Sequence, residues 1–200
     1  TRTPFAHHLF HWLAVSETHI TIDAAIARQE AVKLDGWFSE WDVCNPEESA
    51  PEKRYRLYTL IRESPRLAAV PDAALLLSTQ GHSKIFYLEQ DRNTSGVRQI
   101  AASKTPGYAA LADLKMNRRH FSATTLDFFT VLMVAPDNRR RDSLRNAIAG
   151  KPGANLWRFV SATDLKLETF LHGEVFFSYN EGPFSLVKSP SGQQTETPRT

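Results

Sequence analysis

Two carboxylates stand at the ends of two apolar segments in VPDAALLLSTQGHSKIFYLEQDR, which begins at Val70. Residues 73–79 and 84–91 are predicted to be strands, and QGHS between them a tight turn whose glycine takes a positive φ. Such a hairpin places Asp72 beside Glu89. A buried, unpaired carboxylate is costly or shifts its pKa. The two acids therefore either lie at solvated strand ends or hold a cation, and oxygen ligands suit Mg²⁺ or Mn²⁺.

Four further side chains could support such a site. Lys104 follows in the next predicted helix, where it could reach back over the sheet edge, and Tyr108 is four residues later on the same helical face. Asp91 is either a third ligand or the partner of Arg92 or Lys104 in a surface ion pair. Glu40, on the preceding predicted strand, either joins the acidic cluster or is an exposed strand residue. In the metal interpretation the lysine stabilises the charge of a phosphate transition state.

A basic helix start is the second candidate. Arg139, Arg140, Arg141 and Arg145 lie in NRRRDSLRNAIAG, which is predicted to be a helix that ends at Gly150. Cations near a helix N-terminus are disfavoured by up to ~1 kcal/mol. These side chains are therefore predicted either to contact DNA phosphates or to form a solvated face.

His7 and His11 have the i, i+4 spacing of helical metal ligands. The glutamate of a zinc protease is missing from this segment. The alternative is that HHLFHW is a helix packing its aromatic side on the core. The sequence has neither a serine-nucleophile elbow nor a phosphate-binding loop with a Gly-Lys-Ser signature.

Composition limits the classes of protein. The 200 residues are 42% hydrophobic and 23% charged, which suffices for one domain with a sizeable core. A net charge of +2 does not by itself indicate a nucleic-acid partner. A single cysteine, Cys44, excludes an internal disulfide and a cysteine-built zinc site, and suits a reducing, cytoplasmic compartment. No apolar run approaches ~18 residues, so neither a membrane span nor a signal peptide is expected.

The predicted order is helix, strand, strand, strand, helix, strand, helix, strand, which indicates an α/β fold with a mixed sheet flanked by helices. The elements are predicted as helices 5–31, 95–119 (interrupted or kinked at Pro106 and Gly107), 138–150 and 163–171, and strands 36–43, 73–79, 84–91, 128–137 and 155–162. Residues 1–179 are expected to form one domain. Residues 180–200, rich in Ser, Pro, Gly, Gln and Thr, are expected to be a poorly packed, flexible tail.

This layout resembles a PD-(D/E)XK nuclease. "PD" occurs as Pro71-Asp72 and the second acid as Glu89, while Asp91 stands where the usual lysine would be and Lys104 is placed for a lysine that has migrated to the helix. The blocks HWLAVSETHITI, VPDAALLL, FYLEQDRNTSG, KTPGY and FTVLMVAPDNRRR look like the replication-relaxation family of plasmid and conjugative-element proteins, over roughly residues 8–165.

The resemblance implies a restriction-endonuclease-like core and a role in DNA processing or copy control of mobile elements. It also implies a winged-helix DNA-binding domain upstream of the sequence, which begins TRTPF without Met. Two functions follow as expectations. One is a nuclease that depends on Mg²⁺ or Mn²⁺; the other is an inactive nuclease-like fold that binds DNA or partners a relaxase or replication protein.

Overall fold

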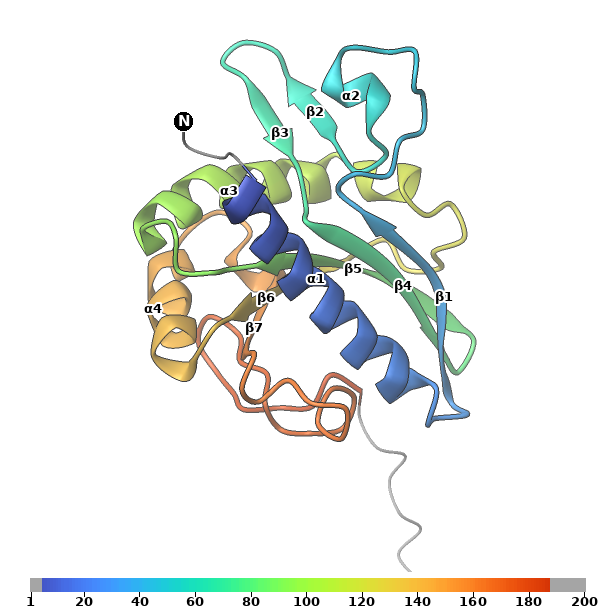
Figure 1. The fold of residues 1–200 in the computed structure, drawn as a ribbon, viewed down its shortest axis with the longest axis vertical. Coiled ribbons are helices and arrows are strands. Elements are labelled where there is room, and N and C mark those ends of the chain that lie inside the picture. Colours follow the sequence, from blue (N-terminus) through green and yellow to red (C-terminus); the bar gives the residue numbers. More distant parts are fainter. Residues whose placement is uncertain (1–4, 188–200) are drawn as a thin grey trace, which may run out of the picture.

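The computed structural model describes residues 5–187, with side chains from His8 onward. Its centre is a mixed five-stranded sheet in the order β1-β4-β5-β6-β7 (Figure 1). The first three strands of that order pair antiparallel, and the last three pair parallel. The strands are β1 Val32–Ser39, β4 Ala73–Thr79, β5 His82–Gln90, β6 Thr130–Ala135 and β7 Trp157–Ser161.

The predicted hairpin is confirmed. β4 and β5 pair antiparallel from Thr79↔His82 to Ala73↔Leu88, and Gly81 in the turn has φ +79°. A glycine suits this position because L side chains rarely adopt such a φ. The segment predicted as a strand at 128–137 also lies in the same sheet, as β6, which is buried at every position because both faces of the strand are covered.

Helices cover the two faces of the sheet. On one face, α1 (Phe5–Ile26) packs Ile22, Ala25 and Ile26 against strand residues such as Leu75 and Leu88. On the other face, α3 (Val97–Asp113) and α4 (Asn138–Ile148) pack against the alternate residues of the same strands. This division follows from the period of two along each strand. Among the described helices, none has the length and apolar content to cross a membrane.

α3 runs without interruption through Pro106, although a break or kink was predicted there. The helix ends at Asp113, and a 3-10 turn, η1 (Met116–Arg119), follows it. Gly107 lies on the side of α3 that faces the backbone of β3. A Cβ on Gly107 would lie 2.4 Å from the Ala68 carbonyl oxygen, so only a glycine allows the two backbones to approach so closely.

A small projecting unit between β1 and β4 was not predicted. It contains α2 (Pro51–Arg54) and a two-stranded hairpin of β2 (Thr59–Arg62) and β3 (Leu67–Ala69). The hairpin extends beyond the main sheet, at the top of Figure 1. The prediction missed it because the strands are short and the segment's prolines and acids are typical of loops.

The C-terminal part differs from two predictions. Residues 163–171 form turns rather than the predicted helix. Residues 180–187, predicted to be the start of a loose tail, pack on the sheet: Phe184, Leu186 and Val187 lie against the apolar cluster on the α1 face. These three apolar side chains, spaced between polar ones, hold the segment against the sheet. The rest of the predicted tail, 188–200, lies outside the described residues.

Candidate functional site

The strand ends that carry the predicted acids meet at one edge of the sheet. Asp72 immediately precedes β4, and its backbone N–H donates to the Leu88 carbonyl oxygen at 3.0 Å. Its Oδ2 accepts the Gln90 N–H at 2.6 Å. Glu89 lies between these two partners in the chain. Asp72 and Glu89 line one cavity of about 400 Å³ together with Lys104.

Two donors from α3 hold Glu89. Lys104 Nζ lies 2.9 Å from Glu89 Oε1 and 2.7 Å from Oε2, and it donates to the Val70 carbonyl oxygen at 2.9 Å. The Tyr108 hydroxyl donates to Oε1 at 2.6 Å. Because α3 is continuous, its residues 104 and 108 share a face. The structure thus brings these predicted residues together, and both oxygens of Glu89 are engaged.

The pKa values of the first trio, Glu89, Lys104 and Tyr108, are set by burial and by neighbouring charges. Burial raises the pKa of Glu89 to about 7, against the opposing positive charge of Lys104. For Lys104, burial would lower the pKa, but the carboxylates of Glu89 and Asp72 outweigh it and raise the pKa. Burial, with the nearby Glu89 charge, also raises the pKa of the Tyr108 hydroxyl. The lysine therefore stays charged and the tyrosine stays a donor near neutral pH.

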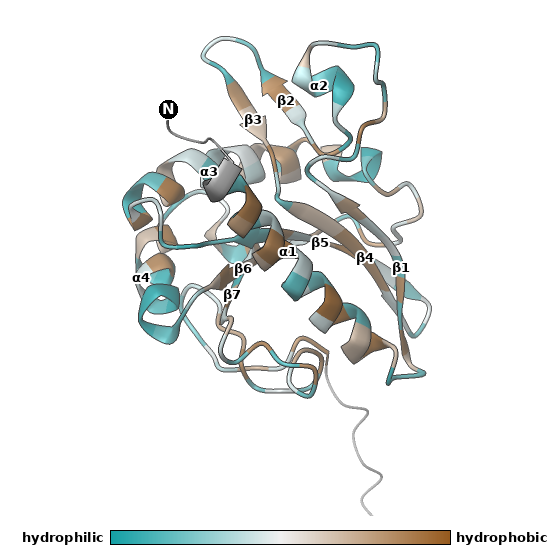
Figure 2. Ribbon diagram, in the orientation of Figure 1, coloured by the Kyte–Doolittle hydropathy of each residue, from teal (hydrophilic) through white to brown (hydrophobic). Residues whose placement is uncertain are grey.

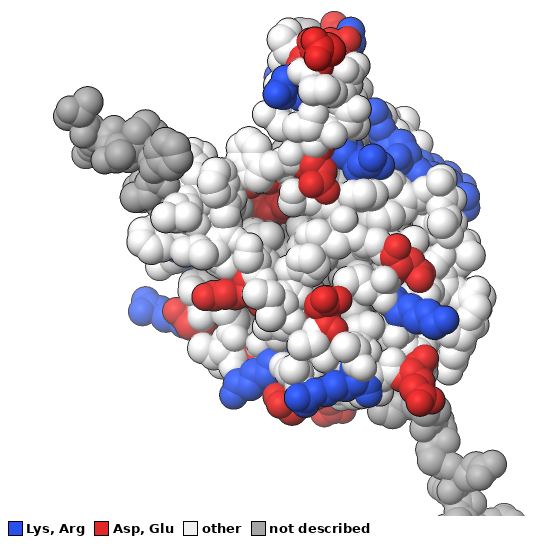
Figure 3. All heavy atoms as spheres, turned by 45° about the vertical axis from the view of Figure 1, so that its right-hand side comes forward, with Lys and Arg blue, Asp and Glu red and all other residues white. Residues whose placement is uncertain are grey.

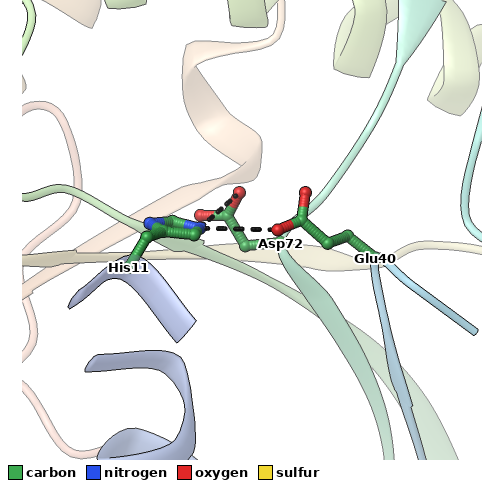
Figure 4. Close-up of side chains that lie close together, drawn as sticks. All are labelled: His11, Glu40 and Asp72. Atoms are coloured by element: carbon green, nitrogen blue, oxygen red, sulfur yellow. Dashed lines mark ion pairs between the residues drawn. The ribbon is translucent and has the colours of Figure 1, made fainter. Parts of the chain in front are cut away.

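A second trio meets at the other oxygen of Asp72 (Figure 4). His11 Nε2 lies 3.4 Å from Asp72 Oδ1 and 3.8 Å from Glu40 Oε1. The imidazole comes from α1, and Glu40 comes directly after β1, with its backbone N–H donating to the Asp72 carbonyl oxygen. Glu40 therefore joins the acidic cluster, which was one of the two alternatives predicted for it.

These three groups shift one another's pKa values. The hydrogen bond to Asp72 raises the pKa of His11, against a smaller opposing effect of burial. Burial would raise the pKa of Asp72, but the His11 hydrogen bond and the charge of Lys104 hold it below its usual value. Burial, and then the charge of Asp72, raise the pKa of Glu40. A proton at His11 therefore partly compensates the two acids.

The three residues of the second trio could together hold a cation. His11, Glu40 and Asp72 each offer one ligand atom, and these atoms lie within 4.8 Å of one another. One imidazole and two carboxylates fit Mn²⁺ better than the harder Mg²⁺, which prefers oxygen ligands alone. The sequence predicted Asp72 and Glu89 as the metal ligands. Because donors from α3 occupy both Glu89 oxygens, the structure favours His11 and Glu40 as the partners of Asp72 instead.

Asp91 does not take either of its predicted partners. It pairs with Arg140, whose Nε and Nη2 lie 2.6 and 3.1 Å from the two carboxylate oxygens of Asp91. Arg140 Nη2 also donates to the Ser95 carbonyl oxygen at 2.5 Å. The prediction of an ion pair with Arg92 or Lys104 was wrong, because α4 brings an arginine 49 residues away in the chain to the end of β5.

Two of the other arginines predicted to contact phosphate are also engaged within the protein. The Arg141 guanidinium lies 4.0 Å from the centre of the Phe177 ring and pairs with Asp142 at 3.0 Å. Arg145 Nε donates to the Ser178 carbonyl oxygen at 2.9 Å. These side chains fasten α4 to the C-terminal segment. Of the four, Arg139 is exposed, and phosphate contact stays a prediction for it.

The sequence interpretation of the first helix was wrong in one respect. HHLFHW was expected to pack its aromatic side on the core, but Phe10 and Trp12 are 54% and 38% exposed. His11, a candidate metal ligand through its spacing from His7, reaches the acids Asp72 and Glu40. The His7 side chain lies outside the described side chains. The i, i+4 histidine pair was a usable signal, but no local pattern showed which residues would face it.

Comparison with protein-family models, with curated proteins and with solved structures gave no match. The resemblance to the replication-relaxation family therefore stays a prediction from the quoted blocks.

Proposed function

We propose that this pocket hydrolyses phosphodiester bonds of DNA with the help of a divalent cation, within a restriction-endonuclease-like core. The observation that carries the proposal is the convergence of Asp72, Glu89 and Lys104 in one cavity, from the start of β4, the end of β5 and the crossover helix α3. Two acids and a lysine at the end of a hairpin are the elements that such chemistry needs.

The order of elements supports the finer fold assignment. A helix, three antiparallel strands, a crossover helix and a parallel strand follow one another as α1, β1, β4, β5, α3 and β6. This is the order implied by the resemblance to PD-(D/E)XK nucleases. The projecting unit of α2, β2 and β3 is inserted between β1 and β4 without disturbing their pairing.

Each residue of the site has a separate chemical role in this proposal. His11, Glu40 and Asp72 would hold Mn²⁺ or Mg²⁺, and the cation would supply charge neutralisation and an activated water. Lys104, fixed at the cavity by Glu89 and the Val70 carbonyl oxygen, would neutralise charge on the phosphate. Tyr108, through its hydrogen bond to Glu89, fixes the carboxylate that positions this lysine.

The engaged oxygens of Glu89 favour a second function, a nuclease-like fold that does not cleave DNA. Both oxygens of Glu89 already bind donors of α3, so this acid is closed to a cation in the arrangement described. A nuclease-like fold that binds DNA or another protein without cleaving would keep such an ion pair as a structural element. The association with mobile elements, and with a relaxase or replication protein, rests on the sequence resemblance.

Calorimetry with Mn²⁺ at pH 8 and a plasmid-nicking assay separate the two functions. We expect Asp72→Asn to lose Mn²⁺ binding. Lys104→Met should bind Mn²⁺ as the parent does but nick DNA at least ~100-fold more slowly, the usual cost of removing one charge-stabilising donor. Asp35→Asn, an exposed acid on β1 remote from the cavity, is the matched control and should behave as the parent in both assays.

The outcomes are distinct. Absence of Mn²⁺ binding by the parent at millimolar concentration would end the nuclease proposal. Mn²⁺ binding that depends on Asp72, without cleavage of supercoiled, linear or single-stranded DNA, would select the non-cleaving fold.

A further inference from the structure

Exposed apolar side chains gather beside the cavity. Of the ten large hydrophobic residues that are exposed among those described, six belong to residues 9–13 and 41–43. The buried residues of α1 come from its C-terminal half. Its N-terminal half also carries apolar residues, brown in Figure 2, and those at 9, 10, 12 and 13 are exposed. Single exposed apolar side chains need no explanation, but a gathered set marks a surface that binds something.

The aromatic members of this surface form a continuous line. The ring centres of His8 and Trp12 are 6.3 Å apart, those of Trp12 and Trp41 are 5.7 Å apart, and those of Trp41 and Tyr55 are 5.8 Å apart. We call these four residues the aromatic strip. The two contacts of Trp41 are T-shaped, with interplanar angles of 79° and 86°. Trp12 and Trp41 remain 38% and 45% exposed, so both indoles can accept a stacked partner.

The strip is joined directly to the candidate cation site. Trp12 follows His11 on α1, and Trp41 follows Glu40 at the end of β1. His8 lines the same cavity as His11. Any chain that lies across the strip therefore passes the second trio.

Cations accompany the aromatic rings. The Arg54 guanidinium lies 5.8 Å from the ring centre of Tyr55, at one end of the strip. The Arg92 guanidinium lies 5.3 Å from the ring centre of Phe10, which is two residues from His8 on α1. Arg54 also donates to the carbonyl oxygens of Pro46 and Glu48, so its guanidinium is held beside the ring. Exposed aromatic rings with cations nearby bind single-stranded nucleic acid, through base stacking and charge attraction to the backbone.

We propose that the aromatic strip stacks the unpaired bases of a DNA strand whose backbone enters the cavity. The inference rests on the proposed function, because the cavity supplies the reason for a nucleic-acid occupant. In a duplex the base faces are covered by neighbouring bases, so the rings can stack only on unpaired nucleotides. The substrate class is therefore single-stranded DNA, or a duplex with a single-stranded end.

Fluorescence anisotropy of a labelled 12-nucleotide oligo(dT), measured in EDTA, tests the strip without metal or cleavage. The parent should bind the oligo(dT) at least tenfold more tightly than a blunt 12-base-pair duplex. Trp12→Ala and Trp41→Ala should each weaken oligo(dT) binding about 10-fold, within the range for loss of one stacked base. Trp12→Phe and Trp41→Phe should restore most of the affinity because an aromatic face returns.

Phe128→Ala removes an aromatic residue that is 55% exposed and belongs to none of the strip contacts, so it should bind as the parent does. Asp35→Asn, an exposed acid on β1 that belongs neither to the strip nor to the lining of the cavity, should also bind oligo(dT) as the parent does. If the nuclease proposal fails but Trp12→Ala still weakens oligo(dT) binding, the strip proposal stands. Unchanged oligo(dT) affinity in both alanine variants would overturn it. So would equal affinity for the duplex, or a dimer in sedimentation that both variants dissociate, which would make the strip a protein interface.

Discussion

At the residue scale, His11 has two roles that exclude each other. Protonated, it is the positive partner of Asp72, and its pKa is raised mainly by that hydrogen bond. When His11 is deprotonated, its Nε2 lone pair can bind a cation that Asp72 also contacts. A proton and a metal therefore compete for one position between Asp72 and Glu40.

This competition gives Mn²⁺ binding a pH dependence with a defined sign. Affinity should fall as the pH falls from about 8 to about 6, since His11 takes up a proton above its ordinary pKa of about 6.5. His11→Gln should bind more weakly at pH 8 and show a flatter profile over this range. Calorimetry at three pH values measures both curves. A parent profile that is flat between pH 6 and 8 would remove His11 from the site.

A second residue, His120, makes a prediction about stability. It is buried between Tyr87 and Thr59, whose hydroxyls lie 2.6 and 2.9 Å from its two ring nitrogens. Burial, aided by two neighbouring arginines, lowers its pKa to about 4. Because the unfolded chain then takes up the proton more readily, His120 contributes stability that is present above about pH 6.5 and is lost as the pH falls toward 4.

The expected size of this loss is about 3 kcal/mol, from a shift between about 6.5 and 4. His120→Gln can keep both hydrogen bonds but cannot titrate. Urea unfolding at pH 7 and pH 4 should show the parent losing about that much stability relative to the variant, while contributions of other groups cancel in the difference. A parent and variant that lose equal stability would show that His120 titrates normally.

At the scale of elements, the contact between α3 and β3 positions the lysine of the site. Gly107 lies against the Ala68 backbone, and Lys104, one turn earlier, donates to the carbonyl oxygen of Val70 just after β3. The projecting hairpin is therefore a support for the cavity. The hairpin can approach α3 this closely only because Gly107 has no side chain.

Gly107→Ala should destabilise the fold by about 2–3 kcal/mol, a typical cost of forcing extra volume into a packed contact. Gly96→Ala is the matched control, because a Cβ there meets nothing within 4 Å. As a change at the N-cap of α3, it should cost less than about 1 kcal/mol. Urea unfolding of the three proteins provides the comparison, and equal stability of the parent and Gly107→Ala would contradict the close contact.

At the scale of the whole molecule, charge is distributed unevenly although the net charge is only +2. Figure 3 shows lysine and arginine side chains gathered at the base of the projecting end, with acids and further basic side chains scattered over the rest of that face. Arg56 and Arg119 are exposed, and both act on buried His120, which places them in one region. Neither forms an ion pair with a described side chain.

These two arginines should govern the salt dependence of DNA binding. If both contact phosphates of a single strand, Arg56→Ala/Arg119→Ala should flatten the slope of log affinity against log salt by about 1.4, at ~0.7 per phosphate contact. Trp12→Ala should lower the affinity and leave the slope unchanged, because stacking releases few ions. Oligo(dT) anisotropy from 50 to 300 mM NaCl distinguishes the two effects, and a steeper or unchanged slope in the double arginine variant would exclude this basic region from the path.

Local sequence pattern was sufficient for four strands of the central sheet and for part of the site, whereas the strand predicted at 36–43 overlaps β1 only over residues 36–39. The apolar runs, the turn around Gly81 and the Asp72 and Glu89 positions together predicted a hairpin with two acids at one end, since a tight turn sets the register of its strands. The shared helical face of Lys104 and Tyr108 also followed from a local rule, because residues four apart are neighbours on a helix.

Tertiary structure alone decided the partners across long stretches of chain. His11 meets Asp72, Arg140 meets Asp91, and Trp12 meets Trp41, and each pair is brought together by how a helix lies on the sheet. Hydrophobic periodicity shows that a helix has a buried face, but not which charged residues lie at that face's edge or where the helix extends past the sheet. For this reason the sequence predicted the acids, and the fold determined what faces them.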